Sequence, residues 1–107
     1  MNDIHQYLEN YIYENIPVIS SMKITISSVA SKSIEVKADI QANINHRNTA
    51  FGGSISTLGI VSGWLLIKYW FLKKGITSTI VIRESKTDFK KPILEDFYAK
   101  VIHLDEE

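Results

Sequence analysis

One stretch of the chain restricts its possible folds more than any other. Between Ile55 and Leu72 the only charged residue is Lys68, so a helix there would be apolar on nearly every side. A helix of that kind either crosses a membrane or is enclosed by the other elements of a domain. Gly59 and Gly63 even have the spacing at which membrane helices pack closely. However, the stretch also contains hydroxyl side chains, and strand-like amphipathic sequence flanks it on both sides. We therefore expect a helix wrapped by a sheet, and no membrane partner.

The sequence around this stretch predicts one further helix and four strands. Apolar residues recur at helical spacing near the N-terminus, and Pro17 ends that pattern because it lacks a backbone N–H. Elsewhere apolar and polar residues alternate with the period of two that is typical of half-buried strands. Gly75 ends the long helix, and Pro92 marks the end of the third strand. The predicted elements are a helix over residues 3–16, strands over 22–30 and 33–40, a helix over 54–74, and strands over 77–89 and 96–104.

This order of elements predicts a single α+β domain over residues 1–107. The first two strands would form an antiparallel hairpin, and the antiparallel β-sheet would be wrapped around one long central helix, which is the hot-dog fold. A sheet that stops at strand 96–104 lacks the last one or two strands of that fold and leaves an open edge that is prone to pairing. Either the chain is a fragment, or another subunit covers this edge.

Composition excludes several classes of function. Lys plus Arg and Asp plus Glu both number 12, so the net charge is zero and no general attraction to nucleic acid exists. The chain has no cysteine, which excludes disulfides, thiol catalysis and cysteine-based zinc sites. No two histidines have metal-binding spacing, and the N-terminus lacks the features of a secretory signal. We therefore expect a cytoplasmic protein that binds no nucleic acid and takes no metal or cofactor.

The residues best suited to chemistry lie just before the long helix, where residues 45–54 read NHRNTAFGGS. The paired glycines Gly52 and Gly53 allow a tight turn and let a ligand approach the main chain. The first amides of a helix have no internal acceptor and lie at the positive end of its dipole. A thioester carbonyl oxygen placed there would gain hydrogen bonds as it becomes an oxyanion. The alternative is that the two glycines only permit the turn and close packing.

These residues also carry a resemblance to a known family. Asn45-His46, the run from Thr49 to Ser54 and the later pair Gly63-Trp64 resemble the YiiD C-terminal-domain-like family of hot-dog-fold thioesterases. The sequence FKKP at residues 89–92 is similar to the aromatic-x-x-Pro that closes the third strand in many such enzymes. The resemblance implies hydrolysis of acyl-CoA or acyl-carrier-protein thioesters. It also implies homodimers or homotetramers with sites at the subunit interfaces.

The chain departs from related thioesterases in one respect that concerns catalysis. Related enzymes of the Gly-Gly type carry an acidic residue on the helix about two turns after the glycines, whereas no Asp or Glu occurs here between Asp39 and Glu84. His46 is the best remaining general base, because its unperturbed pKa suits proton transfer at neutral pH. Asn45 would orient the water or the carbonyl. The alternative is a carboxylate from a partner subunit, either Glu84 or Asp88.

Other residues near the helix start are expected to bind the substrate. Lys90 and Lys91 could meet the phosphates of coenzyme A, although paired lysines are commonly just solvated surface. The remaining candidates for substrate binding are Thr49, Phe51, Ser54 and Thr57.

Two other functions stay open at this point. A non-catalytic acyl-binding or assembly module would keep the pocket without the acid, and the missing helix carboxylate favours it. A hydratase or dehydratase on the same fold would need a paired His and acid near the helix start, and that acid is again missing.

Overall fold

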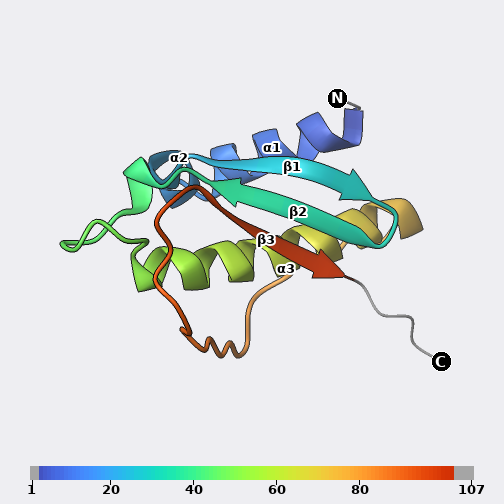
Figure 1. The fold of residues 1–107 in the computed structure, drawn as a ribbon. Helices are drawn as coiled ribbons and strands as arrows, with labels where there is room; N and C mark the ends of the chain where they lie inside the picture. Colours follow the sequence, from blue (N-terminus) through green and yellow to red (C-terminus); the bar gives the residue numbers. More distant parts are fainter. Residues whose placement is uncertain (1–2, 103–107) are drawn as a thin grey trace.

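The structure is a computed structural model, and it describes residues 3–102. Helices cover one face of a small antiparallel sheet, and the long helix runs beneath the strands (Figure 1). The elements are α1 (Asp3–Asn15), α2 (Val18–Met22), β1 (Ile24–Ala30), β2 (Ser33–Ala38), the short 3-10 turn η1 (Gln41–Asn43), α3 (Gly52–Lys74) and β3 (Phe97–Ile102). The sheet order is β1-β2-β3, with both pairs antiparallel.

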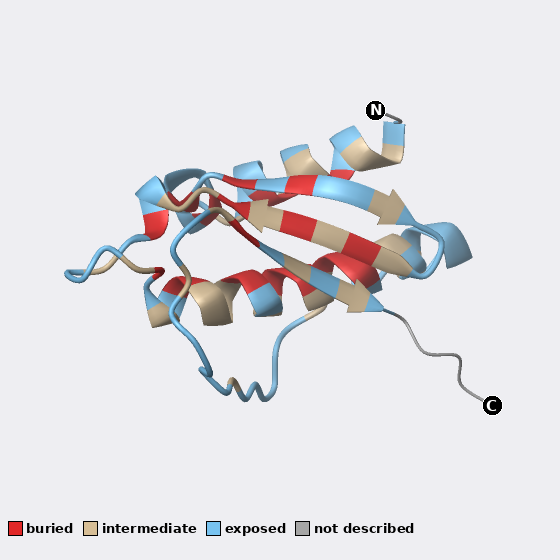
Figure 2. Cartoon of the chain, in the orientation of Figure 1, coloured by how far each residue is buried: buried red, intermediate tan, exposed pale blue. Residues whose placement is uncertain are grey.

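The hydrophobic core lies between the sheet and the helices. Alternate residues of the strands point toward the helices, which produces the buried bands across the sheet in Figure 2. Helix α3 packs against β2 and β3, and its side chains Leu58, Val61 and Leu65 are buried in this core. Each fully buried aliphatic side chain contributes about 1.5–3 kcal/mol. The side of α3 that faces the sheet therefore fixes the helix in place.

The expected central helix under an antiparallel sheet is confirmed. It begins at Gly52 rather than Ser54, and it ends where Gly75 adopts a φ of 70° and donates its N–H to Leu72 O. By length and composition α3 could also cross a bilayer, a test that the core helices of soluble domains pass as well. Its contacts with β2 and β3 favour the interpretation as a core helix.

One predicted strand is wrong: residues 77–89 form no strand in the described part of the chain. A cavity of about 540 Å³ lies between this segment and β3, so its backbone has no neighbouring strand with which to pair. Side chains of α3 hold the segment instead. Trp64 Nε1 donates to Ile80 O at 3.0 Å, and Ser56 Oγ donates to Thr87 Oγ1 at 3.0 Å. The sequence of this segment alone therefore did not suffice to predict whether it pairs as a strand.

The other strand boundaries differ from the predicted ones in small ways. β1 starts at Ile24 because residues 18–22 form α2 and Lys23 adopts a left-handed conformation after it. β2 ends at Ala38. β3 starts at Phe97, directly after Asp96, whose carboxylate accepts the N–H of Ile40 at 2.9 Å. This hydrogen bond, together with the nearby Lys37 ammonium, holds the pKa of Asp96 below its ordinary value. The predicted end of this strand, residues 103–104, lies outside the described residues.

Side chains of α1 cover the outer edge of the sheet at β1. Glu9 accepts the N–H of Ile26 at 2.7 Å, and Tyr13 donates its hydroxyl to Ile24 O at 2.6 Å. His5 Nε2 lies 2.8 Å from Ile26 O. Because the three side chains follow at intervals of four, one face of α1 occupies the backbone groups that a neighbouring strand would otherwise bind. The edge at β1 is therefore covered over Ile24 to Ile26.

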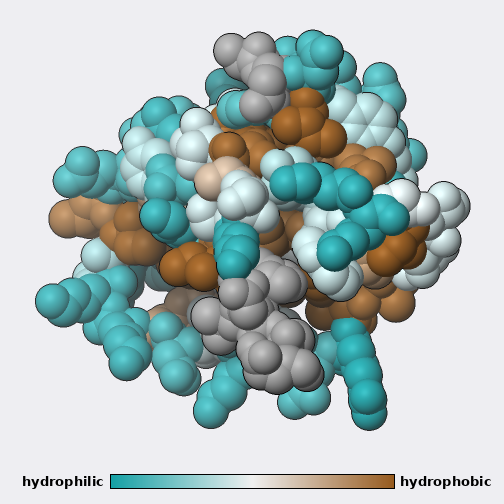
Figure 3. All heavy atoms as spheres, turned by 90° about the vertical axis from the view of Figure 1, so that its right-hand side faces the viewer, coloured by the Kyte–Doolittle hydropathy of each residue, from teal (hydrophilic) through white to brown (hydrophobic). Residues whose placement is uncertain are grey.

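The opposite edge of the sheet, at β3, is open. Within residues 3–102 no further strand pairs with it, and large apolar side chains are exposed on and around it. Figure 3 looks at the end of the molecule where α3 and β3 finish, and apolar side chains lie at the surface there among polar ones. The exposed large apolar residues of β3 itself are Tyr98 and Ile102.

Removing the hydroxyl that covers part of the β1 edge should destabilise the domain. We expect Tyr13→Phe to lower the free energy of unfolding by about 1 kcal/mol, since it leaves Ile24 O without its donor. Urea denaturation would measure the change. Tyr7→Phe is the matched control, because Tyr7 is an exposed tyrosine on the same helix. An equal effect of the two substitutions would contradict the proposed role of the hydroxyl.

The open edge and its exposed apolar side chains predict self-association of the chain. We expect a dimer or a larger oligomer at micromolar concentration, measured by sedimentation velocity. A folded monomer under those conditions would rule out association as the way in which this surface is covered.

Candidate functional site

The start of α3 has two backbone amides without acceptors. Phe51 is the N-cap residue, and its carbonyl already accepts the N–H groups of Ser54 at 2.9 Å and Ile55 at 3.1 Å. A phenylalanine has no side-chain acceptor, so no side chain caps this helix. Among the described residues the N–H groups of Gly52 and Gly53 have no hydrogen-bond acceptor. They therefore remain available at the positive end of a 23-residue helix.

Two phenyl rings lie against these glycines. A Cβ atom on Gly53 would come within 2.5 Å of the ring of Phe51, and one on Gly52 would lie 3.4 Å from the ring of Phe89. Both rings are largely exposed, at 54% for Phe51 and 60% for Phe89. The glycines thus do permit close packing, as the alternative explanation held. However, the rings of Phe51 and Phe89 are exposed and lie beside amides that have no acceptor, so their packing does not exclude a binding site for a ligand here.

A small cavity opens beside Gly52 and contains the two lysines expected to bind the substrate. Its volume is about 360 Å³, and Lys90 and Lys91 line it together with Phe89 and Gly52. The N–H of Ala50 donates to Ile93 O at 2.8 Å, which ties the segment around residue 90 to the entrance of α3. The fold therefore brings Lys90 and Lys91 to the helix start, although some 40 residues separate them from it in the sequence.

The polar loop before α3 uses Asn45 for its own structure. Asn45 Oδ1 accepts the N–H of Arg47 at 2.8 Å and the N–H of Thr49 at 3.2 Å. The side chains of Asn45 and Thr49 also bond to each other, and a bridge between Ile44 and Ala50 closes the loop. Asn45 and Thr49 are therefore committed to the turn in this structure, as the Asx-turn chemistry of asparagine allows.

His46 lies in the exposed part of the same loop, which projects from the body of the molecule (Figure 1). No hydrogen bond or ion pair joins His46 to another residue of the described range. His46 is therefore only a few residues from α3 in the sequence, but in the structure it makes no hydrogen bond to the amides of Gly52 and Gly53.

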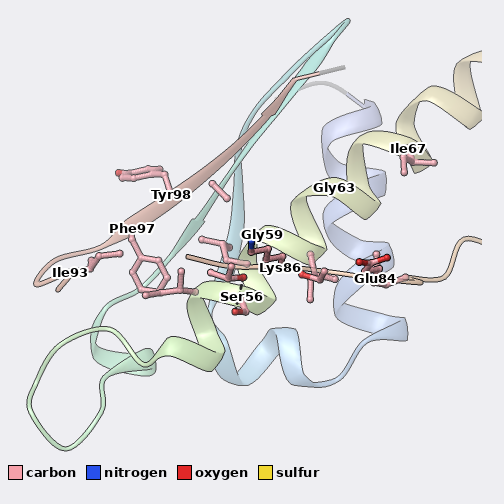
Figure 4. Close-up of a pocket in the computed structure, with 16 residues that line it drawn as sticks. Ser56, Gly59, Gly63, Ile67, Glu84, Lys86, Ile93, Phe97 and Tyr98 are labelled. Carbon is pink, nitrogen blue, oxygen red and sulfur yellow. Dashed lines mark hydrogen bonds between the residues drawn. The ribbon is translucent and has the colours of Figure 1, made fainter. Parts of the chain in front are cut away.

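Glu84 and Asp88 both lie on the exposed segment between α3 and β3. Glu84 lines the cavity of about 540 Å³ whose floor is α3 at Gly59 and Gly63, as Figure 4 shows. Within residues 3–102 neither carboxylate has a hydrogen bond or ion pair, and neither lines the cavity beside Gly52. Their position leaves both free to reach another molecule.

The last two candidates lie on the first turns of α3. Ser54 is buried, whereas Thr57 is half-buried and lines a third cavity of about 370 Å³. We call this cavity the apolar trough, because the other side chains that line it are apolar. They are Ile16, Ile60, Val61, Trp64, Ile80, Val81 and Ile82.

The sequence did not predict two features of this region. Phe89 was interpreted only as the end of a strand, and nothing in the sequence indicated that its ring would lie on Gly52. Of the four aromatic residues in the second half of α3, the sequence could not indicate which one borders a cavity. The structure identifies Trp64. No group of His, Cys, Asp or Glu in residues 3–102 has the geometry of a metal site.

Solved structures resemble this fold closely. A crystal structure described as a "putative thioesterase" from Shewanella oneidensis has a TM-score of 0.91 and is 25% identical, over 95% of this chain and 75% of that one. A protein of unknown function from Chlorobaculum tepidum has a TM-score of 0.93 at 22% identity, over 96% of this chain and 63% of that one. A "Probable Thioesterase" from Pseudomonas aeruginosa has a TM-score of 0.76 at 17% identity, over 94% of this chain and 65% of that one.

The chain therefore spans three quarters of the first of these proteins and just under two thirds of the other two. A family model described as "Putative thioesterase (yiiD_Cterm)" matches residues 5–107. Because the family model covers nearly the whole chain and the fold resembles that of a putative thioesterase, the chain belongs to this thioesterase family.

Proposed function

We propose that the domain binds the acyl thioesters of coenzyme A or of acyl-carrier protein and hydrolyses them at the start of α3. The observation that carries the proposal is the pair of free amides at Gly52 and Gly53, beside a cavity that contains Lys90 and Lys91. The amides would donate hydrogen bonds to the carbonyl oxygen, and the lysines would meet the phosphates of the carrier. Both carriers have such phosphates next to the thiol arm.

In this reaction a water molecule adds to the thioester carbonyl carbon while a base takes its proton. The carbonyl oxygen becomes an oxyanion and is stabilised by the two amides, each worth about 3 kcal/mol in the transition state. The carbon–sulfur bond then breaks, the thiolate takes up a proton, and a carboxylic acid and a free thiol are released. The amides act without any change of protonation, so only the water needs a basic side chain.

We propose that a second subunit brings that base to the amides. Within one chain His46 lies on a projecting loop, and the carboxylates of Glu84 and Asp88 are exposed on the segment before β3. An association of two copies, in a cytoplasmic homodimer or homotetramer, would bring one of these groups of one copy to Gly52 and Gly53 of the other. His46 is the first candidate, because histidine is the side chain that most often serves as a general base at neutral pH.

A non-catalytic acyl-binding module remains the second candidate. One observation favours it: α3 carries no carboxylate, and the described residues that line the cavity beside Gly52 include two lysines but no carboxylate or imidazole. Such a module would bind the thioester and leave it intact.

Turnover of an acyl-CoA series, from acetyl to long-chain, separates these functions. We expect the wild-type protein to release thiol from some members of the series. His46→Ala should lower kcat by roughly 10²-fold or more, the scale of a lost general base. If His46→Ala keeps its turnover and Glu84→Gln or Asp88→Asn loses it, the carboxylate removed by that substitution is the base. Binding without turnover, also when an acyl-carrier protein is offered, would favour the acyl-binding module.

Substitutions of glycine test the site itself in the same assay. Gly53→Val should abolish turnover, because the added side chain would displace the Phe51 ring and enter the space in front of the amides. Gly75→Asn is a control at the other end of α3, where asparagine tolerates the left-handed conformation. Full turnover of Gly53→Val would exclude the helix start as the site.

A further inference from the structure

We propose that Trp64 forms the end wall of an acyl-binding trough and limits the substrate to medium-chain acyl groups. This inference rests on the proposed function, because it assumes that the thioester carbonyl lies at the amides of Gly52 and Gly53. It then states the direction in which the acyl chain extends from them.

The apolar trough lies on the same face of α3 as Gly53. Residue 57 follows residue 53 by four, residues 60 and 61 follow residue 57 by three and four, and residue 64 follows them by four and three, which places all of them along one side of a helix. Thr57, Ile60, Val61 and Trp64 line the trough, and the segment Ile80–Ile82 forms its opposite wall. An acyl chain whose carbonyl meets the Gly53 amide can therefore continue along this face. The volume of about 370 Å³ lies within the usual range of small-molecule pockets.

Several contacts fix the indole of Trp64 at the far end of the trough. Its Nε1 donates to Ile80 O at 3.0 Å, which joins α3 to the opposite wall. The ring stacks on Tyr11, with 5.6 Å between centroids and 24° between the planes. The ammonium of Lys68 also lies over the Tyr11 ring, 4.7 Å from its centroid. Rotation of the indole would break the hydrogen bond and the stacking together, so the wall is rigid.

The distance from the amides to this wall sets a chain length. Eleven residues separate Gly53 from Trp64, which corresponds to about 16 Å along a helix. Contact with the ring takes up about 3.5 Å of that distance. An extended hydrocarbon chain advances about 1.3 Å per carbon, from bonds of about 1.5 Å at near-tetrahedral angles. The path from the Gly53 amide to the ring, of which the trough from Thr57 to Trp64 is the far part, therefore accommodates about ten carbons.

The larger cavity on the other side of the segment is less suited to an acyl chain. One of its walls is β3, at the open edge of the sheet, where backbone N–H and C=O groups have no strand partner within residues 3–102. Covering these groups with a hydrocarbon would remove them from water without replacing their hydrogen bonds, which costs free energy. In the wall of the apolar trough one such group, the carbonyl of Ile80, already accepts a hydrogen bond from Trp64 Nε1.

The chain-length profile of Trp64→Ala tests this inference. We expect wild-type kcat/KM, measured across acyl-CoAs of 4 to 16 carbons, to be highest at about ten carbons, by the helix geometry above. In Trp64→Ala the maximum should move to longer chains, and the preference for a 14-carbon over an 8-carbon substrate should rise about tenfold or more. Trp70→Ala is the matched control, because it removes the other tryptophan of α3, which lines none of the three cavities. Its profile should equal that of the wild type.

A second variant covers the case in which Trp64→Ala does not fold. Ile80→Trp places a large ring in the wall of the trough opposite α3, at a half-buried position that lines neither of the other two cavities, and should move the maximum to shorter chains. Isothermal titration with the same acyl-CoAs gives an independent readout of the preference. An unchanged profile in either folded variant would overturn the role of the trough while leaving the proposed hydrolysis intact. Wild-type protein that neither binds nor hydrolyses any acyl thioester would overturn the proposed function, and this inference with it.

Discussion

The packing of α3 against β2 and β3 is the interaction on which the rest of the structure depends. Leu58, Val61 and Leu65 are buried in the core that the inner faces of these strands form with α3. This packing fixes the direction of the helix and therefore the place where its free amides lie. It also leaves the other sides of α3 uncovered by the sheet, and the three cavities described above lie along them. Core and site are thus two faces of one helix.

The segment between α3 and β3 turns those uncovered sides into separate cavities. It runs back along the helix and is held by the hydrogen bonds of Trp64 and Ser56. On one side of it lies the apolar trough, and on the other lies the cavity that ends at the open edge of β3. The end of the segment brings Phe89, Lys90 and Lys91 to the start of the helix. A stretch without regular secondary structure therefore defines most of the candidate site.

Much of the fold was predictable from local patterns. The apolar run of α3, the stop at Gly75 and the alternation in β1, β2 and β3 all depend on nearby residues, and these elements form close to the predicted positions. Residues 77–89 contain the run Ile80-Val81-Ile82, which is typical of a strand, but a strand also needs a partner, and pairing is a property of the whole sheet. The short helix α2 was missed because only five residues form it, too few for a periodic pattern.

The candidate site was predictable in its backbone more than in its side chains. The glycines at the start of α3 follow from the helix pattern, since an N-terminus always leaves amides free. Contacts between distant residues do not follow in this way. The ring of Phe89 on Gly52 and the hydrogen bond from Trp64 to Ile80 depend on how the chain returns over α3. The commitment of Asn45 to its own loop also became visible only in the folded chain.

The central claim is that the amides of Gly52 and Gly53 receive the carbonyl oxygen of an acyl thioester. Amide NMR spectra, recorded while an S-(2-oxoalkyl)-coenzyme A is added, test it directly, because the ketone of this thioether imitates the thioester carbonyl and is not hydrolysed. The account predicts saturable downfield shifts of the Gly52 and Gly53 amide protons as they become hydrogen-bonded, with the Gly75 amide unchanged, since its N–H already donates to Leu72 O. Saturation of the protein with the analogue while the Gly52 and Gly53 signals stay in place would contradict the account.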